Sequence, residues 1–167
     1  MALDKYLFRP EGMPIAPIAE HMEMFDAGAV RIGVEFRILT DELVAALGLK
    51  ATVTGLNDVG VSLHVFVKAE DGDLERLRFD CFERDPHYHY LTWSMGYNDH
   101  VFLDPAVHSD VLAWSLEMIR TRLPRMLEKT GIENPERLVD AKRIEELMPR
   151  VTEAAYRARF EANQEAI

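Results

Sequence analysis

The fold is decided in the middle of the chain, where residues 59–68 read VGVSLHVFVK. Apolar residues occupy the odd positions, and polar or small residues occupy most of the even positions. Successive side chains of a β-strand point to opposite faces, so this pattern is typical of a strand with one buried face and one open face. The stretch therefore predicts a strand in a half-covered sheet.

The same two-residue period continues on both sides of this stretch. Residues 30–38 (VRIGVEFRI) are apolar at the even positions, and residues 74–82 (LERLRFDCF) have an inner set formed by Leu77, Phe79 and Cys81. Residues 86–93 (PHYHYLTW) predict a fourth strand, and residues 100–103 predict a short fifth one. Clusters of Asn, Asp, Gly and Pro separate these stretches, as turns require. We therefore expect an antiparallel sheet of four to five strands.

Helical patterns flank and follow these strands. Residues 40–48 predict a short helix, and a broad apolar stripe predicts a long helix from about Ser109 to Lys129 that Pro124 kinks or splits. A further helix begins near Pro135 and is interrupted at Pro149. The predicted fold class is α+β, in which the long C-terminal helix packs on one face of the sheet and further helices lie at the C-terminus.

The chain divides into three regions by composition. Residues 1–28 predict an extended N-terminal arm, because Pro10, Pro14 and Pro17 oppose a regular helix. The arm also carries apolar residues, so we expect it to lie across the domain or across a neighbouring chain. Residues 29–130 form the predicted α+β core domain, and residues 131–167 form a C-terminal helical extension.

Composition restricts the function classes. The formal net charge is −10 and no stretch is rich in Lys and Arg, which argues against a nucleic-acid partner. No run approaches the ~18–20 apolar residues of a membrane span, and the N-terminus lacks the pattern of a secretion signal, so we predict a cytoplasmic protein with no membrane partner. The single cysteine, Cys81, excludes an internal disulfide and a cysteine-rich zinc site.

Two histidines in the fourth predicted strand are the principal functional candidates. His87 and His89 are two residues apart, so they project from one face, while Tyr88 and Tyr90 project from the other. Two adjacent imidazoles can bind a metal, relay a proton or hold an anion, and they can also serve only as polar residues of a sheet surface. The choice among these roles depends on which face of the sheet they share.

That face depends on the register of the preceding hairpin, and the sequence allows two. A two-residue turn at Arg84 and Asp85 places Asp80 opposite His89 and puts the histidines on the open face, with the tyrosines in the core. A three-residue loop ending at Pro86 places Cys81 opposite His89 and puts the histidines on the helix side. The buried character of the tyrosines favours the first register, and that of Leu91 and Trp93 favours the second.

The open face of the sheet is the predicted ligand-binding or association surface. By parity it carries arginines, acids, aromatic residues and a histidine, which is unusual for a solvated sheet. Arginine and aromatic residues are enriched at protein interfaces, so a self-association surface is one interpretation; a ligand site and a plain solvated face are the others. The candidate ligand-binding residues are Glu35, Arg37, His64, Arg78, Asp80, His87 and His89.

A divalent metal is the sharpest chemical hypothesis for the histidine pair. Zinc and iron sites need three or four donors, and imidazole and carboxylate groups suit both metals. Our predicted metal ligands are His87, His89 and Asp80; His64, Glu83, Cys81 and His100 are the alternative third ligands, according to the register. In the simpler interpretation the two imidazoles only hydrogen-bond to Asp80 or Glu83, and no cofactor is bound.

The block RFDCF at residues 78–82, the motif DPHYHY at residues 85–90 and the long helix that follows resemble an uncharacterised bacterial domain family. The resemblance covers about residues 59–129 and implies no activity and no site residues. Catalytic motifs such as a glycine-rich phosphate loop are absent from the sequence. We therefore expect a small non-catalytic binding or assembly protein, either a homo-oligomer or an accessory subunit of a larger complex. The alternative is a metal- or ligand-dependent enzyme whose site is built on His87 and His89.

Overall fold

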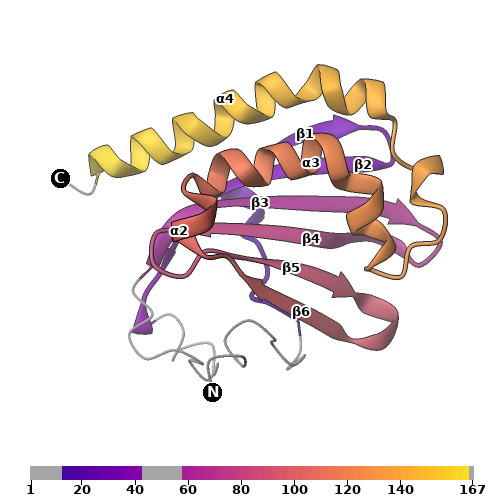
Figure 1. The fold of residues 1–167 in the computed structure, drawn as a ribbon, viewed down its shortest axis with the longest axis horizontal. Helices are drawn as coiled ribbons and strands as arrows, with labels where there is room; N and C mark the ends of the chain where they lie inside the picture. Colours follow the sequence, from indigo (N-terminus) through magenta and orange to yellow (C-terminus); the bar gives the residue numbers. More distant parts are fainter. Residues whose placement is uncertain (1–12, 43–57, 166–167) are drawn as a thin grey trace.

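The computed structural model describes residues 13–42 and 58–165 and contains one antiparallel sheet with two long helices on one of its faces (Figure 1). The strands lie in the sheet in sequence order, β1-β2-β3-β4-β5-β6. They are β1 (Glu23–Ala27), β2 (Val30–Leu39), β3 (Asp58–Ala69), β4 (Gly72–Phe82), β5 (His87–Thr92) and β6 (Tyr97–Phe102). The helices are α2 (Pro105–His108), α3 (Val111–Glu128) and α4 (Ala141–Glu165), with short 3-10 turns η1 (Ala19–His21), η2 (Trp93–Met95) and η3 (Pro135–Arg137).

The predicted α+β class is confirmed, but the sheet has six strands rather than four to five. The additional strand is β1, which lies within the segment that the sequence suggested as an arm. It is only five residues long and pairs with β2 through a tight turn, in which Ala27 lies opposite Val30 and Gly28 has a φ of +80°. Such a short strand gives too few alternations for the two-residue period to be detected.

Both long helices remain continuous through their prolines, so Pro124 does not split α3, and the predicted interruption at Pro149 is wrong. A proline inside a helix costs about 3 kcal/mol. Burial of the apolar face of α4 offsets this cost, because most helix stability in proteins comes from tertiary packing. The buried residues of that face are Ile144, Leu147, Met148, Val151, Ala154 and Ala155. The helix predicted at residues 40–48 lies outside the described residues beyond position 42.

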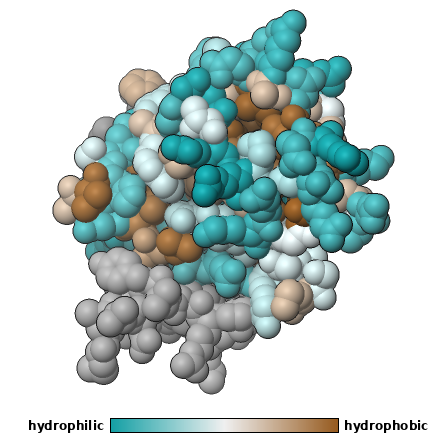
Figure 2. Space-filling view, turned by 45° about the vertical axis from the view of Figure 1, so that its right-hand side comes forward, coloured by the Kyte–Doolittle hydropathy of each residue, from teal (hydrophilic) through white to brown (hydrophobic). Residues whose placement is uncertain are grey.

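The core lies between the sheet and the two helices. α4 packs on β1, β2 and β3, and α3 packs mainly on β4, so β5 and β6 have little helix cover (Figure 1). Strand β3 supplies the centre of this core with Val61, Leu63, Val65 and Val67, all fully buried or nearly so. Within the described part of the chain, no helix has the length and apolar character that a bilayer crossing requires. Hydrophilic residues cover most of the face in Figure 2, and hydrophobic residues form separate patches on it.

A β-bulge in β4 changes which side chains face the helices. The pairing register shifts between Val65 and Phe66, so that these residues lie opposite Leu77 and Glu75, and Arg76 is the additional residue. The alternation with Leu77, Phe79 and Cys81 predicts Arg76 on the open face, but its guanidinium instead bonds the carboxylate of Asp71 and is buried. The bulge thereby places Glu75 on the face opposite the helices.

Candidate metal centre

The face of the sheet opposite α3 and α4 carries a dense set of polar residues that are buried. Residues 13–22 contribute to this burial, because they pass behind the sheet on that side (Figure 1). Arg78 Nη1 donates to the carbonyl of Ile15 over 2.6 Å, and the amide of Ile18 donates to Glu35 Oε1 over 3.1 Å. The buried polar residues of this face, hereafter the polar face, are Glu35, Arg37, Ser62, His64, Glu75, Arg78, Asp80, His87, His89 and Asn98.

The hairpin between β4 and β5 adopts neither of the two registers considered from the sequence. Asp80 lies opposite His87, and Arg78 lies opposite His89. This register differs by two residues from the one with a turn at positions 84 and 85, so the side chains keep the same faces. Both histidines therefore lie on the polar face, and Tyr88 lies on the helix side, where it stacks on Phe79 at 5.7 Å between ring centroids.

His87 and His89 converge on one carboxylate oxygen. The Nε2 atoms of His87 and His89 lie 3.1 and 3.2 Å from Asp80 Oδ2, while the hydroxyl of Ser62 donates to the other oxygen of Asp80. Two donors of a tetrahedral zinc ion, each at about 2.0–2.1 Å from the metal, lie about 3.3 Å apart. The nitrogen–oxygen separations thus match the spacing of two ligands of one ion.

The second nitrogen of each ring determines what Nε2 can do. His87 Nδ1 lies 2.7 Å from the carbonyl oxygen of Asp85, which can only accept a hydrogen bond, so Nδ1 carries the proton. His89 Nδ1 lies 2.7 Å from Asn98 Oδ1 and donates to it in the same way. In neutral imidazoles with these tautomers, both Nε2 atoms present lone pairs to the carboxylate. Three electron-rich atoms at this spacing require a cation between them, either bound protons or a metal ion.

A third imidazole lies next to this pair. Strand β6 pairs with β5 so that His100 lies opposite His89, and its ring centroid is 3.9 Å from that of His87 and 4.6 Å from that of His89. One ring nitrogen of each histidine lies within 4.8 Å of the others. Phe102 stacks on His100 at 4.4 Å, and Phe82 contacts His87 at 5.6 Å. The cluster therefore offers three imidazoles and one carboxylate within an aromatic enclosure.

Burial favours the neutral form of two of these imidazoles, His89 and His100. Burial lowers the pKa of His89, and burial together with the nearby His87 and His89 lowers the pKa of His100 to about 2. Burial alone would raise the pKa of Asp80, but its contacts with His87 and His89 and the charge of Arg78 outweigh it and hold this pKa well below the usual range. Neutral imidazole and ionised carboxylate are the forms that coordinate metal ions.

The polar face holds a second, separate cluster around His64. His64 Nδ1 lies 2.5 Å from Glu75 Oε1, and its Nε2 lies 2.8 Å from Glu35 Oε2. Arg78 completes the cluster with two bonds of 2.8 Å to the carboxylate of Glu75, while Arg37 Nε is 3.9 Å from Glu35 Oε2. Burial alone would lower the pKa of His64, but both glutamates outweigh it and raise this pKa, which favours the charged imidazolium over a neutral metal-binding imidazole.

The structure thus separates our predicted site residues into two groups. His87, His89 and Asp80 converge in one group, to which His100 belongs, whereas His64, Glu35, Arg37 and Arg78 form the other. The remaining alternative ligands lie elsewhere: Glu83 is exposed, and Cys81 faces α3, where its thiol lies 3.4 Å from Ser115 Oγ. Burial raises the pKa of the Cys81 thiol to about 12, so it is not a thiolate ligand.

Two residues of the polar face were missed by sequence reasoning. Glu75 has the parity of the helix side, and only the bulge at Arg76 transfers it to the polar face. Asn98 belongs to a segment that we predicted as a turn, whereas it lies within β6 and bonds His89. A bulge gives no distinct signal in a single sequence. The alternation of Asn98, His100 and Phe102, by contrast, could have predicted that these residues belong to one strand and share a face.

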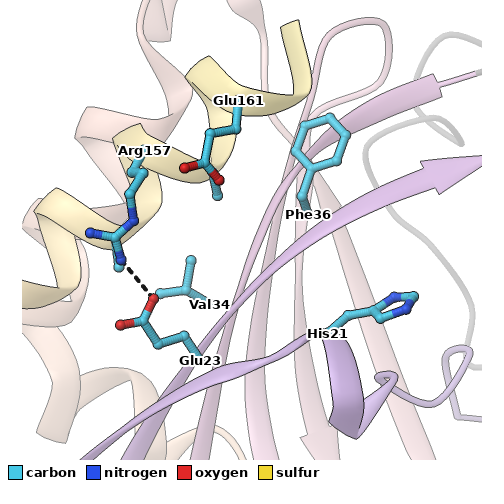
Figure 3. Close-up of a pocket in the computed structure, with 8 residues that line it drawn as sticks. His21, Glu23, Val34, Phe36, Arg157 and Glu161 are labelled. Carbon is cyan, nitrogen blue, oxygen red and sulfur yellow. Dashed lines mark hydrogen bonds and ion pairs between the residues drawn. The ribbon is translucent and has the colours of Figure 1, made fainter. Parts of the chain in front are cut away.

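A different hollow, of about 280 Å³, lies between β1, β2 and the C-terminal half of α4 (Figure 3). The side chains of Val34 and Phe36 line one side, and Glu161 lines the other. Arg157 and Glu23 form an ion pair of 2.8 Å across it. None of the residues of the two polar clusters lines this hollow, so it is not part of the candidate metal centre.

Comparisons with other proteins give a family but no activity. Neither the search of curated proteins nor the search of solved structures found a match. A family model with the description "Domain of unknown function (DUF7700)" matches residues 24–155. This range includes helix α3, the four donors of the candidate metal centre and, except for Glu23, all six strands. The predicted relation to an uncharacterised domain family is thereby confirmed, and it extends beyond residues 59–129. The chain belongs to the DUF7700 family of domains of unknown function.

Proposed function

We propose that this domain is a non-catalytic metal-binding protein that holds one divalent transition-metal ion, such as Zn(II), on His87, His89 and Asp80, with His100 as the fourth donor. The observation that carries the proposal is the convergence of two Nε2 lone pairs on Asp80 Oδ2 at 3.1 and 3.2 Å. A divalent ion at this point satisfies all three atoms at once.

The surroundings of the donors support a metal more than bound protons. Metal-binding histidines usually donate their other N–H to a carbonyl or carboxylate, which fixes the tautomer; the contacts of His87 with Asp85 and of His89 with Asn98 have this form. Burial lowers the pKa of His89 and so disfavours the imidazolium form that bound protons would require. Imidazole and carboxylate donors suit zinc and iron alike.

The number of donors supports a closed site rather than a catalytic one. Structural zinc sites use four protein donors, whereas catalytic sites use three and leave a position for water or substrate. The three imidazoles lie within 4.8 Å of one another and Asp80 adjoins two of them at 3.1 and 3.2 Å, so the proposed set has four protein donors, which agrees with a binding rather than an enzymatic role. A cytoplasmic location remains our prediction from the sequence.

We expect tag-free protein, stripped with a chelator, to take up one equivalent of Zn(II), and Co(II) to give the intense visible absorption of four-coordinate cobalt. The double variant H87A/H89A should lose at least ~100-fold in affinity, and N98A, which removes the acceptor of His89 Nδ1, about 10–100-fold. Calorimetry with a competing chelator measures the Zn(II) affinities of both variants.

The matched control is H21A/H108A, which removes two histidines outside the cluster and should leave the affinity unchanged. Thermal unfolding of each apo protein shows whether the variants are folded. Failure of the wild-type protein to bind Zn(II) or Co(II), or equal affinities of H87A/H89A and the control, would disprove the metal centre. In that case the histidines only hydrogen-bond to Asp80.

Self-association is the second candidate function, and the edge strand β1 favours it. Among the described strands, β1 has a neighbour on one side only; the hollow of Figure 3, partly lined by Val34 and Phe36, lies beside it, and Phe160 of α4 is 62% exposed. An exposed edge next to apolar surface is suited to pairing with a second copy. We expect size-exclusion chromatography with light scattering to give a dimer mass, and a monomer mass at all concentrations would contradict this candidate.

A further inference from the structure

A second candidate binding site lies on the helix side of the sheet, away from the polar face. It is a hollow of about 300 Å³ beside α3, above the part of β5 that the helices leave uncovered. Tyr88, Tyr90 and Trp114 line its floor together with two methionines, and three basic side chains of α3 and its C-terminal end form its rim. We call it the aromatic hollow.

Aromatic contacts fix the position of the floor. The ring centroids of Tyr88 and Tyr90 are 5.3 Å apart, and those of Tyr88 and Trp114 are 5.7 Å apart. Phe79 supports Tyr88 from the core through a stacked contact of 5.7 Å. Because Tyr88 and Trp114 are only half-buried, part of each ring remains accessible. The floor is thus a rigid aromatic surface that can stack against a flat ring.

The rim consists of three cations, Arg122, Arg125 and Lys129, at helical spacings of three and four residues. Like charges at these spacings repel each other and destabilise a helix. The other cation of α3, Arg120, forms ion pairs with both Glu117 and Glu145. Across residues 13–42 and 58–165, no carboxylate forms an ion pair with any of the three rim cations. Lys129 Nζ lies over the ring of Tyr90 at 5.2 Å.

The positive rim is unusual for a chain with a formal net charge of −10. None of the residues that line the aromatic hollow is acidic. Three cations with no carboxylate partner in the described part of the chain, beside half-buried aromatic rings, are complementary to a molecule with a negative group and a flat apolar body. Arginine also stacks on aromatic groups and forms two parallel bonds to carboxylate or phosphate, which fits the same kind of ligand.

The geometry points to the aromatic hollow as a binding site for a small planar aromatic anion. Its ring would stack on Tyr88 and Trp114, and its acidic group would lie between Arg122 and Arg125. The volume of about 300 Å³ is at the lower end for small-molecule sites, whereas a specific protein interface buries at least ~1,000 Å². The hollow therefore fits a small molecule rather than a macromolecule.

Fluorescence titration tests this site with the aromatic sulfonate 8-anilinonaphthalene-1-sulfonate and its uncharged analogue N-phenyl-1-naphthylamine. We expect the sulfonate to bind native protein and R122Q/R125Q to weaken it by about tenfold, which corresponds to 1.4 kcal/mol. The same variant should not change binding of the uncharged analogue. The control K142Q/R143Q removes two exposed cations from α4 and should bind like the wild type.

Three results would overturn the site. The first is no binding of the sulfonate to native protein, and the second is equal affinity of R122Q/R125Q and the control. The third is displacement by hexaglutamate at concentrations where benzenesulfonate has no effect, which would instead assign an acidic protein partner. The substituted side chains are exposed, and unchanged thermal unfolding of each variant confirms that a lost affinity is not lost folding.

Discussion

Glu75→Gln should lower the free energy of unfolding by about 3–5 kcal/mol, the range for removing one partner of a buried ion pair. The carboxylate of Glu75 is 6% exposed and accepts from His64 Nδ1 at 2.5 Å and from Arg78 at 2.8 Å through two nitrogens. The amide of glutamine has nearly the same shape but no charge. The substitution leaves the buried guanidinium of Arg78 without a bonded carboxylate, since its other direct partner is the neutral carbonyl of Ile15.

Urea-induced unfolding at neutral pH measures this effect. The matched control is Asp73→Asn on the same strand, because Asp73 pairs with Arg31 at the surface, where the two side chains are 40% and 36% exposed. Exposed ion pairs contribute at most about 1 kcal/mol, so the control should remain close to the wild type. A loss at E75Q no larger than the loss at D73N would contradict the importance of the His64 cluster.

The stability advantage of the wild type over E75Q should disappear as the pH falls from 4.5 to 2. Burial alone would raise the pKa of Glu75, but bonds from His64 and Arg78 outweigh it and lower this pKa to about 2 from an ordinary 4.5. A carboxyl group whose pKa is lowered by folding stabilises the folded state at pH values above the pKa that the group has in the unfolded chain. This contribution is lost as the pH falls and the group is protonated in the folded state. The shift corresponds to about 3 kcal/mol.

Unfolding curves of both proteins at a series of pH values from 7 to 2 measure this dependence. The comparison isolates Glu75, because other groups that titrate in the same window, such as Asp80, are present in both proteins. His64 does not reverse the sign, because its pKa is raised and it is therefore protonated throughout the window from pH 4.5 to 2. A difference between the two proteins that is as large at the acidic end as at pH 7 would refute the prediction.

The two clusters of the polar face are adjacent and act on different properties. Arg78 bonds Glu75 in one cluster and lies opposite His89 of the other. The cluster around His64 also holds the N-terminal segment through Ile15 and Ile18. We therefore expect E75Q to affect stability foremost, and N98A to affect metal affinity with little loss of stability. Measuring both properties on both variants separates the two roles.

The sequence by itself determined strands β2 to β5, the long helix α3 and the fact that His87 and His89 share one face. Apolar and polar residues alternate with a period of two, and this period defines which side chains point together. It also limited the site residues to Glu35, Arg37, His64, Arg78 and Asp80, all of which lie on the polar face.

Only the tertiary structure decided which of these residues meet. A strand can shift by two residues without changing the face of any side chain, so alternation alone cannot place Asp80 opposite His87. The bulge that brings Glu75 to His64 and the pairing that brings His100 to His89 both depend on backbone hydrogen bonds between strands. The period of the sequence fixes the face, whereas the pairing of neighbouring strands fixes the distances on which any chemistry depends.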